Sequence, residues 1–497
     1  MKINVKQSSQ PLTAADVEGV ESLIYLTSPT LSTELSAKIP YGSLIKQRLA
    51  RQGPSQSGDE SFATHLPNTV GTHTLWVTLK KDPSSFELLT LARKWSATQL
   101  KANPKQITLA IIDLDGALAL RAVEALLAAL LAAVHPLPSF KNRKIAAKQL
   151  TTLRVYGLEK KLTLQRTFAE AEGNNLARYL TALPPNELTP GNYRKEIQRL
   201  AKQYGWQMDF IDMKALQQKQ AGAFLAVAQG SANRDAGIVH LRYEPTARKA
   251  KQAKRLALVG KGICFDTGGT NLKSAKSMHG MHEDMEGSAV ALGTLVALTE
   301  LKINHPVDCW LAISENQIGP AAYRQNEVVK ASNGVTIEIV HTDAEGRLVL
   351  ADTLSFAALT LPDLIIDYAT LTGACVAALS SRYCGIFTNR MALLDTIIQA
   401  GRDSGERVWP FPNDDDFDDE LESQIADIKQ CTLGNDADHI LATRFLNRFV
   451  ANIPWLHIDL SAGNHKGGLA HIPTDITGFG VRFTLELLLS QAIMKKL

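Results

Sequence analysis

The sequence predicts an α/β fold, with a small N-terminal α/β domain and a larger C-terminal α/β domain built on a mixed, mostly parallel sheet flanked by helices. Short β-branched runs alternate with longer helical segments, as in strands joined by crossover helices. The 497 residues exceed what one ordinary hydrophobic core accommodates, so two domains are expected. With 45% hydrophobic and 21% charged residues, the composition is that of a globular protein.

Residues 1–160 are expected to form the small domain and residues 170–497 the large one. In the small domain, the β-branched run 107–114 predicts a strand, and the Ala-rich run 117–134 predicts a helix that stops at the prolines after it. The run 150–158 predicts the next strand. No catalytic group of residues is visible in this part of the chain.

The large domain begins with a helix that should end before Pro184. The next helix should restart with Thr189 as N-cap and Pro190 as its first residue. Beyond it the chain alternates between short apolar runs and one long helical run. The expected helix is 287–301, and the expected strands are 222–230, 236–245, 255–263, 308–316 and 364–371.

The charge balance gives no reason to expect nucleic acid or a membrane as the main partner. Lys and Arg number 53 against 50 Asp and Glu, a net charge of +3. In the most membrane-like run, 117–134, Arg121 and Glu124 leave an uncharged stretch too short to span a bilayer, so a buried helix is expected.

The cysteines and the N-terminus predict a cytoplasmic protein. The five cysteines are odd in number and form no CxxC pair, so we expect reduced thiols. The first twenty residues have no apolar run of the length that a secretory signal requires.

Three segments of the large domain concentrate charged residues beside glycines. VGKGICFDTGG (259–269), followed by Lys273, resembles a phosphate-binding loop only superficially, because no Ser or Thr follows its Gly-Lys pair and the four-residue spacer is absent. MHEDMEG (281–287) and HTDAEGRLVLAD (341–352) supply further acids. In an extended segment, alternation would place the acids of HTDAEGR and Arg347 on one side.

The acids of these segments predict a metal site. Hard divalent cations take carboxylate oxygens, and a close pair of cations needs several acids, at least one of them bridging. None of the acids has an obvious basic partner at ion-pair spacing in the sequence, and unpaired buried carboxylates would be unfavourable, so metal ions are the natural compensation. The four acids are Asp266, Asp284, Asp343 and Glu345.

Together with YATLTGAC (368–375), these three segments closely resemble the corresponding blocks of the leucyl aminopeptidase family, the two-metal M17 cytosol aminopeptidases. LPPNELTP (183–190) and TGFGVR (477–482) are also similar to family landmarks, so the resemblance covers about residues 170–497. Residues 1–160 are assigned to the smaller N-terminal domain of the family by position alone.

The resemblance implies a role for each matching residue. The implied metal ligands are Lys261, Asp266, Asp284, Asp343 and Glu345, with Asp266 and Glu345 bridging both ions. Lys261 would then be a neutral amine, which requires a strongly lowered pKa. Lys273 and Arg347 become the catalytic pair, and Lys273, Met281, Thr370, Leu371 and Gly373 match the substrate-binding positions.

The resemblance also implies cofactors and partners. Two divalent ions are expected, zinc or manganese first, with cobalt or magnesium also compatible with the donor set. A bicarbonate held at Arg347 would shuttle a proton, and Lys273 would stabilise the oxyanion. The substrates would be peptides with a free N-terminus, with leucine or another apolar residue preferred, and the assembly would be a homohexamer.

Two alternatives remain open at this point. A dipeptidase or amide hydrolase could use the same metals, and a secondary DNA-binding role is disfavoured only by the near-neutral charge. The sequence departs from the family in three places: His341 stands where Asn is usual, Glu286 replaces a small residue, and the loop 461–475 is divergent.

Overall fold

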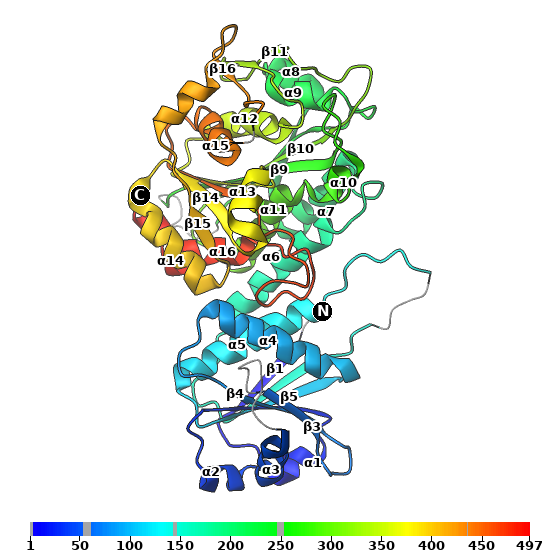
Figure 1. Ribbon diagram of the computed structural model, residues 1–497, viewed down its shortest axis with the longest axis vertical. Helices are drawn as coiled ribbons and strands as arrows, with labels where there is room; N and C mark the ends of the chain where they lie inside the picture. The colour runs from blue at the N-terminus through cyan, green and yellow to red at the C-terminus, as the bar shows by residue number, and fades with distance from the viewer. Residues whose placement is uncertain (1–2, 53–60, 143–146, 246–252, 435) are drawn as a thin grey trace. The chain divides into compact units, whose positions relative to one another are not determined.

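The computed structural model describes residues 3–52, 61–142, 147–245, 253–434 and 436–497. The chain forms two compact units (Figure 1). The first comprises Met1–Phe168 with Leu469–Pro473, and the second comprises Ala169–Gly468 with Thr474–Leu497. Each unit contains a sheet of mostly parallel or mixed strands with helices packed on it, so the predicted α/β class is confirmed.

The first unit is built on a six-stranded sheet of order β1-β6-β5-β2-β4-β3, in which only β3 is antiparallel to its neighbour. Its strands are β1 (Asn4–Ser8), β2 (Ser22–Thr27), β3 (Ser61–His65), β4 (His73–Thr78), β5 (Gln106–Ile112) and β6 (Thr152–Tyr156). Its helices are α1 (Ala14–Glu18), α2 (Thr33–Lys38), α3 (Gly42–Gln52), α4 (Ser85–Gln99), η1 (Leu100–Ala102) and α5 (Gly116–Val134).

The Ala-rich run forms α5, which begins where the side chain of Asp115 accepts hydrogen bonds from the backbone of Ala117 and Leu118. By length and composition alone, α5 is long and apolar enough to cross a membrane, a test that tolerates the two charges of Arg121 and Glu124. However, 72% of its most apolar 18-residue window is buried inside the protein. The helix packs against α4, and the expected buried helix is confirmed.

The second unit is built on an eight-stranded sheet of order β15-β14-β17-β13-β9-β10-β8-β7. The four central strands, β17, β13, β9 and β10, are parallel, whereas β14, β8 and β7 are antiparallel to inner neighbours. The strands are β7 (Gln207–Asp212), β8 (Gly237–Tyr243), β9 (Leu256–Asp266), β10 (Val307–Asn316), β13 (Leu364–Ala369), β14 (Cys384–Thr388), β15 (Val408–Pro410) and β17 (Trp455–Asp459). A small separate sheet holds β11 (Val328–Lys330), β12 (Thr336–Glu338) and β16 (Ile428–Lys429).

Two helices cover opposite faces of the central strands. Alternate residues of β9, including Val259 and Ile263, share a core with α12 (Glu345–Ala358) and α9 (Gly222–Ala228). The residues between them face α11 (Glu286–Glu300), where Gly260 lets the backbone of Ser288 approach closely. Figure 1 shows α12 and α15 (Asp438–Asn447) on one side of β9 and β10, and α11 on the other.

The remaining helices connect and flank these layers. They are α6 (Gln165–Thr181), α7 (Pro190–Tyr204), α8 (Met213–Gln218), α10 (Ala275–Met278), η3 (Met281–Glu283), α13 (Gly373–Leu379), η4 (Ser380–Arg382), η5 (Met391–Leu393), α14 (Leu394–Ser404), η6 (Asp415–Leu421), α16 (Val481–Leu485), η7 (Glu486–Ser490) and η8 (Ile493–Lys495). The predicted start of α7 is confirmed, because Thr189 is its N-cap and Pro190 its first residue.

One element differs from its prediction: residues 222–230, expected to be a strand, contain helix α9. No side chain at the N-cap position satisfies its first amides. Instead, the buried carboxylate of Asp352, on α12, accepts hydrogen bonds from the backbone N–H of Phe224 at 2.8 Å and of Ser332 at 2.6 Å. A residue 128 positions away therefore caps this helix, and the local apolar run carries no sign of it.

Replacing Asp352 with Ala should lower the free energy of unfolding by about 2–4 kcal/mol, because it leaves the backbone amides of the buried Phe224 and the half-buried Ser332 without this acceptor. Urea unfolding followed by circular dichroism measures this change. The matched control is Asp395→Ala, which removes an exposed acid from the first turn of α14 and should change stability by less than about 1 kcal/mol. Equal effects of the two substitutions would contradict the capping role of Asp352.

Candidate active site

The candidate site lies at the carboxyl edge of the central parallel strands. Because these strands run in the same direction, the residues at their ends meet at one edge of the sheet, where ligands bind in open α/β sheets. Strand β9 ends at Asp266, β10 at Asn316 and β17 at Asp459, and Thr370 directly follows β13. Sequence segments about 200 residues apart therefore meet here.

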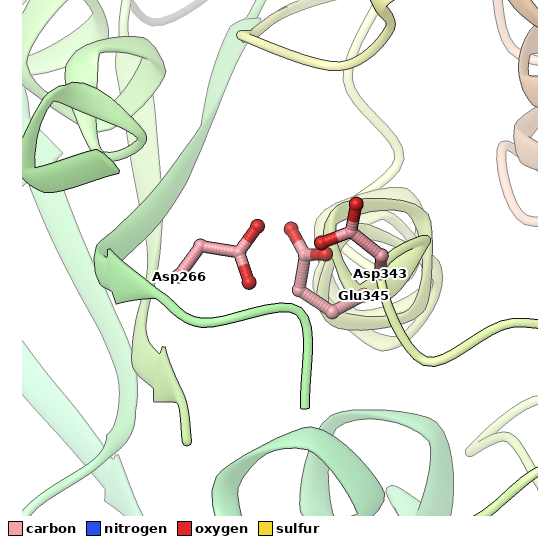
Figure 2. A group of neighbouring side chains, drawn as sticks. All are labelled: Asp266, Asp343 and Glu345. Carbon is pink, nitrogen blue, oxygen red and sulfur yellow. The ribbon is translucent and has the colours of Figure 1, made fainter. Parts of the chain in front are cut away.

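Three predicted ligands converge at this edge. Ligand oxygens of Asp266, Asp343 and Glu345 all lie within 4.8 Å of one another. Figure 2 shows the carboxylate of Asp266, at the end of a strand, turned toward those of Asp343 and Glu345, at the start of a helix. The segment is not extended, because α12 begins at Glu345. The side chains therefore meet at a helix N-terminus, and alternation along an extended segment is the wrong explanation.

Lys261 and Asp284 lie beside these three acids. Lys261 Nζ is 2.7 Å from Asp284 Oδ1 and 2.9 Å from Glu345 Oε1, and it donates to the carbonyl oxygen of Thr370 at 2.9 Å. The lysine reaches them past Gly346, where a Cβ atom would lie 2.6 Å from Lys261 Cε. Glycine at this position thus lets a strand residue approach the first turn of α12.

Lys273 pairs with the other half of the acid group. Its Nζ lies 2.9 Å from Asp266 Oδ2 and 2.5 Å from Asp343 Oδ1. The expectation that these acids lack basic partners is therefore wrong. The partners come from other segments of the chain, which ion-pair spacing within one segment cannot reveal.

Burial shifts the protonation equilibria of this group. Desolvation, followed by repulsion from neighbouring carboxylates, raises the pKa of Asp343 and Glu345 above the ordinary range, and burial also raises the pKa of Asp284. Burial alone would lower the pKa of Lys261, but the surrounding carboxylates raise it overall. The protein's own groups thus oppose the predicted neutral amine, which would require the added charge of bound cations.

The residues present fit divalent metal ions. Asp284 Oδ2 and Glu345 Oε2 are buried and have no hydrogen-bond partner among the described residues. Carboxylate oxygens are the donors that hard divalent cations prefer, and an amine nitrogen suits zinc and other first-row ions. Four carboxylates and one amine within a few ångströms can therefore hold such ions.

A hydrogen-bonded frame that sequence reasoning missed holds Asp266. Asn316 Nδ2 donates to Asp266 Oδ1 at 2.8 Å and to the carbonyl oxygen of Thr342 at 3.0 Å. Thr342 and Asn271 exchange backbone and side-chain hydrogen bonds, which ties the loop after β9 to the loop before α12. Asn316 ends a predicted strand, so its position at the strand end was an available signal.

Arg347 lies on α12 and does not pair with any of the predicted ligands. Its Nη2 donates to Asp438 Oδ1 at 2.8 Å and its Nη1 to the carbonyl oxygen of Gln430 at 3.1 Å. Its side chain is only 2% exposed, against 23% for Asp438. Neither Asp438 nor Gln430 lies in a segment that the sequence singled out.

Of the predicted substrate residues other than Lys273, Thr370 has a direct contact with the acid group. Thr370 donates its hydroxyl to Asp284 Oδ1 at 2.8 Å. The backbone N–H of Leu371 donates to Asp459 Oδ1 at 3.2 Å, and Gly373 is the exposed first residue of α13. Met281 is half-buried in η3, just before Asp284. The loop 370–373 is thus fixed from both sides.

His341 and Glu286 take no part in the acid group. The ring Nδ1 of His341 accepts a hydrogen bond from the backbone N–H of Asp343 at 3.2 Å, so this nitrogen is not available as a metal ligand. Glu286, the first residue of α11, is buried with its carboxylate against Gly463 of the divergent loop 461–475. Burial, with a smaller contribution from Glu283, raises the pKa of Glu286 to about 8.

Comparisons with known proteins agree on one family. The sequence profile of the cytosol aminopeptidase family, catalytic domain, matches residues 175–485. A probable cytosol aminopeptidase from a Synechococcus strain is 34% identical over 98% of this chain and 99% of its own length. Another from Persephonella marina is 40% identical over 65% of this chain, a stretch that spans 64% of that relative. The solved structure of a tomato leucine aminopeptidase mutant matches 98% of this chain and 97% of its own, with a TM-score of 0.83 and 26% identity.

Replacing Glu286 with Gln should stabilise the metal-free protein increasingly as the pH rises. The folded-state pKa of about 8 lies above the ordinary 4.5, so the carboxyl favours folding in its protonated form, and this contribution is lost between about pH 4.5 and pH 8. The full difference is on the order of 4–5 kcal/mol as an upper bound. Urea unfolding at several pH values measures it, with Glu422→Gln as an exposed control. A difference in stability between Glu286→Gln and the wild type that does not change with pH would contradict the raised pKa of Glu286.

Proposed function

Because this chain belongs to the cytosol aminopeptidase family and is an aminopeptidase, we propose that it releases leucine or another apolar residue from the N-terminus of peptides, using two divalent metal ions. One observation carries the proposal: Asp266, Asp343 and Glu345 converge within 4.8 Å at the carboxyl edge of the sheet. Lys261 and Asp284 adjoin them through short contacts.

In this proposal the metal ligands are Lys261, Asp266, Asp284, Asp343 and Glu345, with Asp266 and Glu345 bridging. Bound ions would polarise the scissile carbonyl and lower the pKa of a water so that it becomes a nucleophile near neutral pH. Zinc or manganese are the first candidates, and cobalt or magnesium also suit oxygen donors with one amine. The raised pKa values of the carboxyls imply that protons compete with metal at a higher pH than for ordinary acids.

Lys273 would stabilise the oxyanion that forms at the scissile carbonyl. Its ammonium group is held between Asp266 and Asp343, so it enters the reaction without having to reorganise. The carboxylates around it raise its pKa, which keeps it a cation near neutral pH. Lys273 therefore has the charge and the position that electrostatic stabilisation requires.

The substrate would lie along the loop after β13. Leu371 and Gly373 would present backbone groups to the peptide, and Met281 and Thr370 would lie near the pocket for its first side chain. The start of this loop is held on two sides, because Thr370 bonds to Asp284 and Leu371 to Asp459. Such fixation supports precise placement of the scissile bond.

The remaining parts of the proposal rest on the resemblance and on the names of the relatives. The proposed compartment is the cytoplasm, and the proposed catalytic domain is residues 170–497. The proposed assembly is a homohexamer, which light scattering after size-exclusion chromatography tests. The resemblance also implies a bicarbonate at Arg347, but in this chain both terminal nitrogens of that guanidinium already donate within the protein.

Removing divalent metal with a chelator should abolish hydrolysis of leucyl-p-nitroanilide, and adding back each ion in turn should identify those that restore it. Glu345→Ala should reduce activity to background with every ion, because it removes a proposed bridging ligand. Activity that survives both treatments would refute the two-metal site. N-acetylated leucyl-p-nitroanilide separates an aminopeptidase from an amide hydrolase, since only the latter would cleave it.

Replacing Lys273 with Met should lower kcat by about two to three orders of magnitude, because the variant keeps an unbranched side chain, shorter by one atom, but loses the charge that stabilises the oxyanion. Metal content, measured by elemental analysis, should stay near that of the wild type. A variant that binds metal normally and keeps full kcat would exclude this role for Lys273.

A further inference from the structure

The guanidinium of Arg347 already holds an anion that belongs to the chain. Asp438 Oδ1 accepts from Nη2 at 2.8 Å, and the carbonyl oxygen of Gln430 accepts from Nη1 at 3.1 Å. Among the described residues, no acceptor bonds to Nε. A carboxylate of the chain therefore already occupies one of the two terminal nitrogens with which a bidentate oxyanion would pair.

Asp438 is placed for this contact by its own helix. It is the first residue of α15, and Ala437, at the N-cap position, lies in the left-handed region with φ of 55°. No side chain caps α15 there, and the carboxylate of Asp438 reaches across to Arg347 on α12. An acid in the first turn of a helix also interacts favourably with the positive end of the helix dipole.

The same contact is part of the frame around the acid group. Gln430 Oε1 accepts from the backbone N–H groups of Val340 and His341, and its Nε2 donates to the carbonyl oxygen of Ala344 at 2.9 Å. Its own carbonyl oxygen accepts from Arg347. The Arg347–Asp438 pair is therefore connected, through one buried residue, to the loop that carries Asp343 and leads into Glu345.

We propose that Asp438 is a positioning residue that serves as the built-in counter-anion of Arg347, in the place where an external anion such as bicarbonate would otherwise bind. The inference rests on the proposed function. It follows that this enzyme works without an added anion. Removal of the Asp438 carboxylate should leave a buried cation with a free donor pair, which a small oxyanion can fill.

Asp438→Ala tests this in the metal-loaded, full-length enzyme. Binding of ¹³C-labelled bicarbonate is followed by NMR line broadening, and hydrolysis of leucyl-p-nitroanilide is followed with and without millimolar bicarbonate. The wild type should bind no bicarbonate at Arg347, and added bicarbonate should change its activity less than about twofold. The variant should lose about tenfold or more in kcat and recover most of it, saturably, with bicarbonate.

Matched variants separate this from a general structural effect. Asp438→Glu keeps a carboxylate, so its activity should not depend on bicarbonate. The double variant Asp438→Ala, Arg347→Ala should not bind bicarbonate, and its activity should not change when bicarbonate is added. Asp418→Ala breaks a comparable pair with Arg444, 2.7 Å long and outside the site, and should show no bicarbonate effect. If Asp438→Ala does not fold, Asp438→Ser takes its place and keeps a polar first helical residue.

Two results would overturn the proposal: a wild type that binds and needs bicarbonate as the variant does, or a variant that is fully active without it. If the wild type hydrolyses no peptide with any metal, the proposed function fails instead. The binding measurement then still decides whether Asp438 excludes the anion from Arg347.

Discussion

Negative charge buried at the carboxyl edge of β9, β10 and β13 has to be balanced within a few ångströms. Asp266, Asp284 and Glu345 are all less than 10% exposed, and Asp343 is half-buried beside them. Lys261 and Lys273 divide these four acids into two pairs. Such a group of carboxylates is unfavourable without cations. Contacts from other parts of the second unit hold these acids and lysines in place.

The supporting contacts come from segments far apart in the sequence. Asn316 fixes Asp266, Gly346 admits Lys261 to the first turn of α12, and Gln430 holds the loop before that helix. The N-terminus of α12 also presents its positive dipole end to Glu345. Because each ligand is held by hydrogen bonds or packing, the site has the preorganisation that electrostatic catalysis depends on.

Local signals predicted most of the fold that lies near the site. Strands β9, β10 and β13 and helix α11 were found because their apolar runs are long and bounded by glycine or polar residues. Helix α7 was found from its N-cap Thr189 and the proline after it. Helix α9 was missed because its apolar run has no cap of its own and is held by Asp352 from another helix. Tertiary contacts there overrode the local pattern.

The sequence by itself determined the chemistry of this protein: carboxylates beside glycines and the TDAEGRL segment predicted its family and its acid group, because donor types are a property of the residues. Only the tertiary structure decided how Arg347 is used. Its partner Asp438 lies 91 positions away, at the start of a helix with no motif of its own. Likewise, Lys261 pairs with Asp284 and Glu345, and Lys273 with Asp343, all from other segments of the chain. Such contacts arise when strand ends and helix termini meet, and spacing along the chain does not record them.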